Sequence, residues 1–253
     1  KPSLHLRRLP LVRPLVWAAA LTTLAVVPAQ AQSLLQLYDT AHGFDAPYQS
    51  ALANAQAAQA RADQARAGLL PQNGSVVGSQ PLYRPANRIA WDQGKRAAEA
   101  AHVQLSGTEQ DLIVRLSQAY FDVLAAEDSL SFVRTLKAAV AVQLEAAKRN
   151  FEVGNATITD SREAEARFDL ATAQEIAAEN DLRVKRLALD QLVGLVGIQP
   201  QPLAQPIVLP QAQPQDVNTW VDWAVNQHPA VVQSRMALDI ARLETAKARA
   251  GHQ

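Results

Sequence analysis

The sequence predicts a mainly α protein built on a long antiparallel coiled-coil helical hairpin, and three observations lead to that fold class. Of the 253 residues, 48% are hydrophobic but only 5% are aromatic, and alanine is abundant, which suits helix seams better than a thick globular core. Apolar residues recur at alternating steps of four and three along two long stretches. A short Gly-containing segment separates these stretches, which makes them antiparallel neighbours.

Residues 1–31 are expected to be a signal peptide rather than part of the fold. Four basic residues come first, the 13-residue apolar run LVWAAALTTLAVV follows, and Ala29-Gln30-Ala31 supplies the small-x-small cleavage pattern. The apolar run is shorter than the roughly 20 residues of a membrane-spanning helix. Because the chain begins with Lys1 instead of Met, we expect the gene to start upstream.

The charge balance and the lack of cysteine exclude several classes of function. The first 31 residues carry four of the 24 basic residues and none of the 24 acidic ones, so the remainder has a net charge of −4. A mildly acidic exported chain without a basic cluster is a poor candidate for nucleic-acid binding. Without cysteine there is no disulfide framework and no thiolate metal site.

Residues 32–72 are predicted to form the first helical segment, with a break near Gly43 and Pro47. From Pro47 onward the sequence ALANAQAAQARADQARAG consists almost entirely of strong helix formers. Gly68 and Pro71 are expected to end this helix.

Residues 73–90 are predicted to hold a residual β-strand segment. Asn73-Gly74 is a turn signal, and the following VVGSQPLYRP mixes β-branched, aromatic and proline residues, which confine a strand to an edge or to strand ends. Tyr83 and Trp91 are candidates for a membrane–water interface, where amphipathic rings gather. Ordinary packing where a strand meets a helix explains these two aromatics equally well.

Residues 91–197 are predicted to form the long helical hairpin. Its first helix extends from about Asp92 to Val153, which at 1.5 Å per residue gives a rod of roughly 90 Å. The steps along the seam average 3.5 residues, which indicates left-handed coiled-coil packing. The seam residues of this helix are Leu112, Leu116, Ala119, Val123, Ala126, Leu130, Val133, Leu136, Val140, Leu144, Ala147 and Phe151.

The second helix of the hairpin is predicted from about Ser161 to Val196, ended by Gly197. Its seam keeps the same spacing but includes Glu175 and Lys185, so that part of the seam must reach water or a charged neighbour. The seam residues are Ala164, Phe168, Ala171, Glu175, Ala178, Leu182, Lys185, Leu189, Leu192 and Val196.

The hairpin tip, residues 153–160, has features that exceed the needs of a turn. Gly154 is predicted to cap the first helix in the left-handed region, and Asp160, three residues before Glu163, to be the N-cap of the second. These two caps would satisfy helix ends in any hairpin. They leave unexplained the apolar residues Phe151, Val153 and Ile158, which would lie at a solvent-exposed apex.

The C-terminal part is predicted to be an extended Pro-rich linker, residues 198–216, followed by helix over 217–253 with a break at His228-Pro229. A faint repeat links this helix to the first helical segment. Pro47, an Ala-rich helix and Gly68 reappear as Pro229, a similar helix and Gly251.

Four segments, in this order, resemble the TolC-type outer membrane efflux protein family, also called outer membrane factors, and cover most of the chain after the signal peptide. The last two are the most specific. The segments are ARAGLLPQ (65–72), QPLYRPANRIAWDQGK (80–95), AYFDVLAAEDSLSF (119–132) and NFEVGNATITDSREAEARFDL (150–170).

The resemblance implies a two-halved, α-barrel protomer. Three protomers would form one outer-membrane β-barrel continuous with a periplasmic tunnel, located in the cell outer membrane and mostly exposed to the periplasm. The implied function is a passive exit duct for drug efflux or type I secretion, with a periplasmic adaptor (membrane fusion protein) and an inner-membrane pump as partners. The repeat at Pro229 would mark the start of the second half.

The resemblance also implies roles for the tip. Val153 and Gly154 match the adaptor-contact motif, and Thr159 with Asp160 matches the polar pair near the gate of the tunnel. Asn155 stands where family members often have Leu, which bears on the strength of the adaptor contact.

The chain departs from the family pattern in its barrel region. Only nine residues separate Pro71 from Pro81, whereas one membrane strand needs about 9–11 residues and the family has two strands there. The chain also stops at Gln253, where the family's third strand would begin. We therefore expect the N-terminal half of a protomer with a shortened barrel region.

No catalytic arrangement stands out in the sequence. The histidines His5, His42, His102, His228 and His252 are scattered, without metal-binding spacing, and the common nucleotide-binding and hydrolase motifs are missing. We expect neither an enzyme nor a metal or cofactor site. The alternative function is a structural or adaptor-like periplasmic coiled coil without a channel. It is disfavoured because an adaptor should carry a β domain between its helices.

Overall fold

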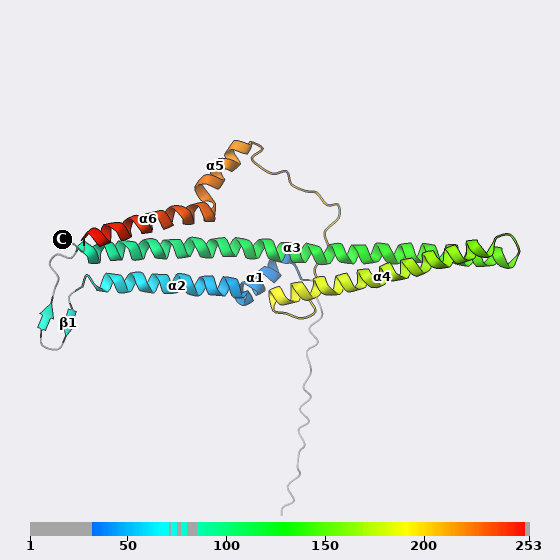
Figure 1. Cartoon of the computed structure of the whole chain (residues 1–253), viewed down its shortest axis with the longest axis horizontal. Helices are drawn as coiled ribbons and strands as arrows, with labels where there is room; N and C mark the ends of the chain where they lie inside the picture. Colours follow the sequence, from blue (N-terminus) through cyan, green and yellow to red (C-terminus); the bar gives the residue numbers. More distant parts are fainter. Residues whose placement is uncertain (1–31, 71, 75–76, 80–84, 251–253) are drawn as a thin grey trace, which may run out of the picture. The chain divides into compact units, whose positions relative to one another are not determined.

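A computed structural model describes residues 32–70, 72–74, 77–79 and 85–250 (Figure 1). These residues form six helices and two short strands, so the predicted mainly α fold class is confirmed. The predicted signal peptide, residues 1–31, lies outside the described residues. In chain order the elements are α1 (Leu34–Phe44), α2 (Ala46–Ala67), β1 (Gln72–Gly74), β2 (Val77–Ser79), α3 (Pro85–Glu152), α4 (Ile158–Val193), α5 (Val217–Gln227) and α6 (Pro229–Ala250).

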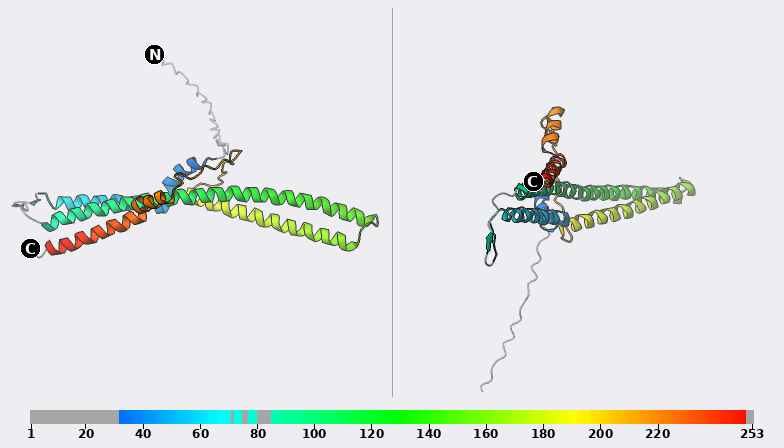
Figure 2. Two further views of the ribbon diagram at one scale, coloured as in Figure 1. Left: turned by 90° about the horizontal axis from the view of Figure 1, so that it is seen from above. Right: turned by 60° about the vertical axis from the view of Figure 1, so that its left-hand side comes forward.

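Helix α3 organises the fold, because α1, α2, α4 and α6 all pack against it. It has 68 residues and is therefore about 100 Å long at 1.5 Å per residue. Along its first half it lies beside α2 and α6, and along its second half beside α4 (Figures 1 and 2). Helix α2 approaches α3 closely at Gly94, where a Cβ would lie 3.1 Å from the Cα of Ala62.

The start of α3 differs from the prediction. The helix begins at Pro85 rather than near Asp92, so the last six residues of the predicted β segment, 85–90, are helical. Proline is well suited to the first helical position, because its fixed φ fits the helix and its missing N–H would have no partner there. The mix of β-branched, aromatic and proline residues predicts a short strand in this segment and does not reveal the start of the helix.

Helices α3 and α4 form the predicted antiparallel hairpin, and α4 is 36 residues long. It ends at Val193 and not at Val196, because Gly194 takes the left-handed conformation with φ +76° and stops the helix before Gly197 is reached. As a result Val196, predicted to be in the seam, is 97% exposed.

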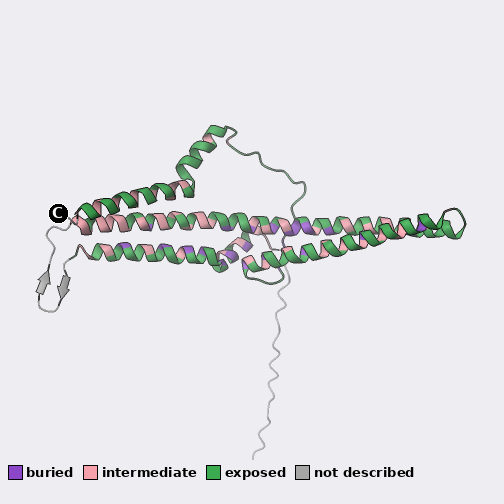
Figure 3. Ribbon diagram, viewed as in Figure 1, coloured by how far each residue is buried: buried purple, intermediate pink, exposed green. Residues whose placement is uncertain are grey.

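The hydrophobic core is centred where α1 meets the middle of α3 and the end of α4 (Figure 3). Leu37 from α1, Leu112 and Leu116 from α3 and Leu189 and Val193 from α4 are all almost completely buried. This cluster fixes the base of the hairpin.

The junction between α1 and α2 is held by an ion pair between the buried Asp45 and the partly exposed Arg115. Asp45, which is 5% exposed, accepts hydrogen bonds from both Nη atoms of Arg115 at 3.0 Å each. The same carboxylate accepts the backbone N–H of Tyr48 at 3.0 Å and so caps the start of α2. These hydrogen bonds attach the bend between α1 and α2 to α3.

Strands β1 and β2 pair antiparallel, with Asn73 opposite Gly78 at the centre of a three-residue register. They confirm a residual β segment and are much shorter than the roughly 9–11 residues of a membrane strand. Tyr83 lies outside the described residues. Among the helices of the described part, none combines the length and apolar character needed to cross a bilayer.

The two terminal helix pairs match in length, which strengthens the internal repeat. Helices α1 and α2 have 11 and 22 residues, and α5 and α6 have 11 and 22 as well, with one residue between the helices of each pair. Pro229 opens α6, whereas Pro47 is the second residue of α2, so Ala46 is the true counterpart of Pro229. That offset explains why the two proline-to-glycine spacings in the sequence differ by one residue.

The Pro-rich linker is irregular, as predicted, and both of its ends are anchored. At its start Gln32 forms a parallel bridge with Pro200, and the hydroxyl of Tyr120 donates to the carbonyl of Gln201 at 2.7 Å. At its end the indole N–H of Trp220 donates to the carbonyl of Pro214 at 2.6 Å.

Candidate functional site

The tip of the α3–α4 hairpin is closed by a Schellman turn. The N–H of Gly154 donates to the carbonyl of Phe151 at 3.0 Å, and the N–H of Asn155 donates to the carbonyl of Asn150 at 2.8 Å. Gly154 has φ +79°, so the predicted left-handed conformation is confirmed. The turn therefore satisfies the last carbonyls of α3 with backbone atoms alone.

The start of α4 differs from the prediction in its capping residue. Thr157, not Asp160, is the N-cap, and α4 begins at Ile158 instead of Ser161. The Thr157 hydroxyl accepts the N–H of Asp160 at 3.2 Å, and the Asp160 carboxylate accepts both the N–H and the O–H of Thr157 at 2.8 Å. Asp160 is thus the N3 residue of a capping box whose N-cap is Thr157.

The capping box also sets the charge of Asp160. The backbone N–H of Thr157, followed by its hydroxyl, stabilises the carboxylate and lowers the pKa of Asp160 below its usual value of 3.8. Asp160 is therefore negatively charged at neutral pH. It lies in the first turn of α4, where a negative charge is favourable to the helix dipole.

The tip presents apolar side chains to solvent. Phe151 is 42% exposed, Val153 68% and Ile158 51%, as the sequence predicted for an apex. Asn155 and Thr159 are exposed as well. Asn155 occupies the position after Gly154 where Schellman turns often have an apolar residue packed back on the helix, so the turn here lacks that contact.

An open cleft of about 240 Å³ lies behind the tip, between the two helices. Small and apolar residues line it from both sides, and charged residues of α4 border it. Its lining residues are Val140, Gln143 and Ala147 from α3 and Asp160, Glu163, Ala164 and Arg167 from α4.

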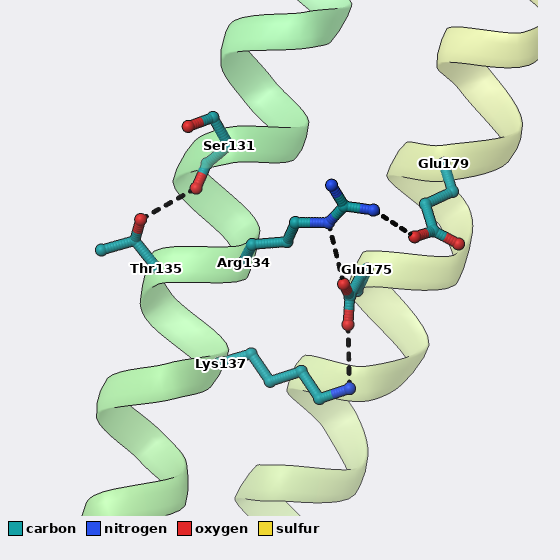
Figure 4. Close-up of polar contacts among 6 residues, drawn as sticks. All are labelled: Ser131, Arg134, Thr135, Lys137, Glu175 and Glu179. Carbon is teal, nitrogen blue, oxygen red and sulfur yellow. Dashed lines mark hydrogen bonds and ion pairs between the residues drawn. The ribbon is translucent and has the colours of Figure 1, made fainter.

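Further from the tip, a charge cluster joins the two helices (Figure 4). Arg134 of α3 donates to Glu175 at 3.1 Å and to Glu179 at 2.7 Å, and Lys137 donates to Glu175 at 2.8 Å. We call Arg134, Lys137, Glu175 and Glu179 the charge cluster. The hydrogen bonds from Lys137 and then Arg134 lower the pKa of Glu175 below its usual 4.5.

The sequence predicted that the charged seam residues Glu175 and Lys185 reach water or charged neighbours. Both have charged partners on α3. Glu175 lies in the charge cluster, and Lys185 donates to Asp122 at 3.0 Å. Arg186, the next residue of α4, donates to Glu127 of α3 at 2.7 Å. Charged pairs therefore follow the hairpin seam on α4 from Arg186 to Glu175.

Trp91, the described candidate for a membrane interface, is half-buried in the second turn of α3. The ammonium of Lys95 lies 4.0 Å from its ring centroid and 2.8 Å from the carboxylate of Asp92. A cation–π contact thus holds the ring against its own helix. The interface role of Trp91 stays a prediction.

Within the described residues, the structure brings together no group of three or more His, Cys, Asp or Glu side chains that could hold a metal ion. What the tip offers is a shaped surface: a rigid turn, exposed apolar side chains and nearby charges. Sequence reasoning missed Thr157, although the spacing from Thr157 to Asp160 is a capping-box signal. It also missed Arg134 and Lys137 as the partners of Glu175.

Comparisons with known proteins agree on the family. Residues 73–195 match the model of the "Outer membrane efflux protein" family. The chain is 32% identical to the outer membrane protein TolC of Vibrio cholerae over 94% of its own length and 59% of that protein. It is 31% identical to TolC of Escherichia coli K12 over 88% and 50%, and 32% identical to the alkaline protease secretion protein AprF of Pseudomonas aeruginosa over 68% and 36%.

Solved structures share the fold at low sequence identity. A membrane protein from Pseudomonas aeruginosa superposes with a TM-score of 0.75 at 19% identity, covering 86% of this chain and 57% of that one. The Campylobacter jejuni CmeC outer membrane channel superposes with a TM-score of 0.71 at 17% identity, covering 85% and 52%.

The chain spans between about a third and three fifths of the length of the relatives it matches. These relatives are described as outer membrane and secretion proteins and not as enzymes. The helical hairpin with its capped tip, the matched family model and the level of identity together place this chain, over about half the length of a typical relative, in the outer membrane efflux protein family.

Proposed function

We propose that this chain is part of the outer-membrane channel of a tripartite efflux pump or a type I secretion system. In this role it forms part of a passive periplasmic tunnel and exit duct, located in the outer membrane and mostly exposed to the periplasm. TolC and AprF are the relatives that support this proposal. The duct takes its substrate specificity from the pump behind it and carries out no chemistry of its own.

The observation that carries the proposal is the exposed apolar surface of the tip. A Schellman turn already caps the end of α3 and the capping box of Thr157 and Asp160 caps the start of α4, so a plain hairpin gains nothing from exposing Phe151, Val153 and Ile158. Exposed apolar groups on a rigid, fully hydrogen-bonded turn are typical of a contact surface. We therefore assign Val153, Gly154 and Asn155 to the adaptor contact.

Thr159 and Asp160 belong to the same proposed contact surface, next to the tunnel entrance. Thr159 is exposed, and Asp160 is fixed in orientation by its two hydrogen bonds to Thr157. A charged group held in one orientation suits a polar contact better than a mobile one, because less conformational entropy is lost on binding.

The proposed assembly is a homotrimer docked by a periplasmic adaptor and an inner-membrane pump. Helix α5 supports an assembly, because it has no buried residue although Trp220 and Trp223 are on it, 45% and 43% exposed. Apolar helices of this kind are stable when another helix covers them.

The location and the assembly are tested on the full-length gene product. Membrane fractionation and chemical cross-linking should place it in the outer membrane as a trimer. A soluble periplasmic monomer would contradict the proposal and favour a coiled-coil protein without a channel.

The tip contact is tested by cross-linking, since the chain has no native cysteine. Asn155→Cys and Thr159→Cys, each carrying a photoreactive reagent, should cross-link to the adaptor in cells. Ala177→Cys, an exposed position of α4 away from the tip, is the matched control and should not. If neither tip variant cross-links while the protein still reaches the outer membrane as a trimer, the tip is a plain turn.

A further inference from the structure

The α3–α4 hairpin is not held uniformly along its length. The charge cluster divides it into a proximal part, toward the base of the hairpin, and a distal part, which comprises residues 138–152 of α3, the turn and residues 158–174 of α4. The two parts differ in their seam residues, in their ion pairs and in the space between the helices.

The proximal part buries more large aliphatic side chains than the distal part, where Val140 and Phe168 of the seam are only half-buried. The buried residues of the proximal part include Leu112, Leu116, Tyr120, Val123, Leu124, Ala126 and Leu130 from α3 and Leu182, Leu189 and Val193 from α4. In the distal part the buried residues are Leu144, Ser161 and Ala171. Because apolar stabilisation scales with the area removed from water, the distal seam is the weaker one.

The ion pairs follow the same division. In the described residues, every ion pair that joins α3 to α4 lies in the charge cluster or proximal to it. In the distal part the charged residues of α4 pair along their own helix, Arg162 with Glu165 and Arg167 with Glu163. Such pairs stiffen a helix but do not attach it to its neighbour.

Within the charge cluster, the pair of Lys137 and Glu175 is better protected from solvent than the other cross-helix pairs, whereas Arg134 is 55% exposed. The Glu175 side chain is 19% exposed and that of Lys137 27% exposed, and both carboxylate oxygens of Glu175 are engaged, one by Arg134 and the other by Lys137. Pairs that are partly shielded are screened less by salt. The last charged connection between the two helices before the tip is therefore the one with the best-shielded carboxylate.

We infer that the charge cluster is a hinge, distal to which the hairpin opens and closes as a unit while the proximal part stays packed. The open cleft of about 240 Å³ lies within the distal part and provides the room for this motion. The motion moves the tip relative to the base of the hairpin, so Glu175 positions the tip from a distance. The inference concerns the hairpin alone and does not depend on the proposed function.

Distance measurements between spin labels test the hinge. Two label pairs use exposed residues on facing helices: Ala146 with Ala166 in the distal part and Ala125 with Ala188 in the proximal part. In the otherwise unaltered chain the distal pair should give the broader distribution of distances. Glu175→Gln should shift the distal distribution to longer distances and broaden it further, with the proximal one unchanged.

Two further variants keep the test decisive. Lys137→Gln leaves Arg134 bound to Glu175 and should cause an intermediate broadening. Glu165→Gln removes an acidic group that pairs only along α4 and should change nothing. Raising the salt concentration from about 0.05 to about 1 M, where the screening length falls to about 3 Å, should reproduce part of the Glu175→Gln effect in the unaltered chain, because Arg134 is exposed whereas Lys137 and Glu175 are partly shielded, and should have less effect in the variant.

The hinge is overturned if Glu175→Gln moves both label pairs equally or moves neither. Equal movement would mean that the charge cluster holds the whole hairpin. No movement would mean that the small distal seam is sufficient by itself. Circular dichroism of each variant, with helix content equal to that of the unaltered chain, excludes loss of folding as the cause.

Discussion

Replacement of Asp45 by alanine should destabilise the fold, because it removes the contacts that hold the α1–α2 junction against α3. This carboxylate is 5% exposed and makes three hydrogen bonds of 3.0 Å, two with Arg115 and one with the N–H of Tyr48. The change therefore removes an N-cap and a bidentate ion pair together. Arg115 is 41% exposed and regains water, so little penalty arises from its unpaired charge.

The size of the effect follows from these contacts. Loss of an N-cap costs about 1 kcal/mol, and loss of hydrogen bonds to a charged group costs about 1.5–3 kcal/mol. We therefore expect Asp45→Ala to lower the free energy of unfolding by about 3 kcal/mol. For a chain of this size that corresponds to a fall in Tm of about 6–12 °C. Asp45→Asn keeps an oxygen for the cap but loses the charge, and should cost about half as much.

Thermal unfolding followed by circular dichroism measures these differences, with Asp63→Ala, an exposed position of α2, as the control. Acid adds a second test. Burial raises the pKa of Asp45, but Arg115 and the N–H of Tyr48 lower it more, so the folded-state pKa lies below the usual 3.8. The contribution of Asp45 is complete above pH 3.8 and is lost as the pH falls through the folded-state pKa.

The gap in Tm between the unaltered chain and Asp45→Ala should accordingly narrow in acid. The reasoning fails if Asp45→Ala costs no more than Asp63→Ala. It fails also if the gap stays constant from neutral pH to well below pH 3.8.

Four other substitutions test the helix ends and the linker by thermal unfolding, with hydrogen exchange as a second measurement for the linker. Gly154→Ala and Gly194→Ala both force a left-handed alanine, at φ +79° and +76°, which costs about 1–2 kcal/mol. A Cβ at Gly154 meets open space, whereas a Cβ at Gly194 would lie 2.4 Å from the ring of Phe44. Gly194→Ala should therefore lower the free energy of unfolding clearly more than Gly154→Ala, and adding Phe44→Ala should remove the difference. Equal losses of stability for the two glycine variants would contradict this reasoning. Tyr120→Phe removes the hydroxyl that donates to Gln201 and should lower the free energy of unfolding by about 1 kcal/mol. It should also increase hydrogen exchange of the backbone amides at the start of the linker. Unchanged exchange would show that the linker is anchored elsewhere.

The hairpin could be predicted because its evidence lies within each helix. Spacing of apolar residues is a property of one segment and predicted both helices, and the short Gly-containing segment between them predicted their antiparallel order. The spacing also indicated that Glu175 and Lys185 needed water or charged neighbours. It could not identify Arg134, Lys137 or Asp122 as those neighbours, because the pairing depends on how far one helix is shifted along the other.

Helix ends were harder to predict, because several residues compete for the same role. Thr157 and Asp160 are both good N-caps, and only the observed backbone shows that Thr157 takes the cap and Asp160 supports it. Pro85 was consistent with a strand end and with a first helical position, and the structure has the second. At the tip the exposed apolar residues were predictable from composition. Their binding role stays a prediction, since it depends on the surface of the partner.

The length of α3 restricts how the gene can change. A single residue inserted into α3 would rotate all following residues of the helix by about 100° about its axis. The residues that pack against α4 would then no longer face it. An insertion of seven residues returns the packing residues of α3 to within about 20° of their original direction and lengthens the helix by about 10.5 Å. The two helices stay packed along their length only if α4 gains seven residues as well. Length variants of this hairpin should therefore arise as paired insertions or deletions of seven, placed at equal distances from Gly154.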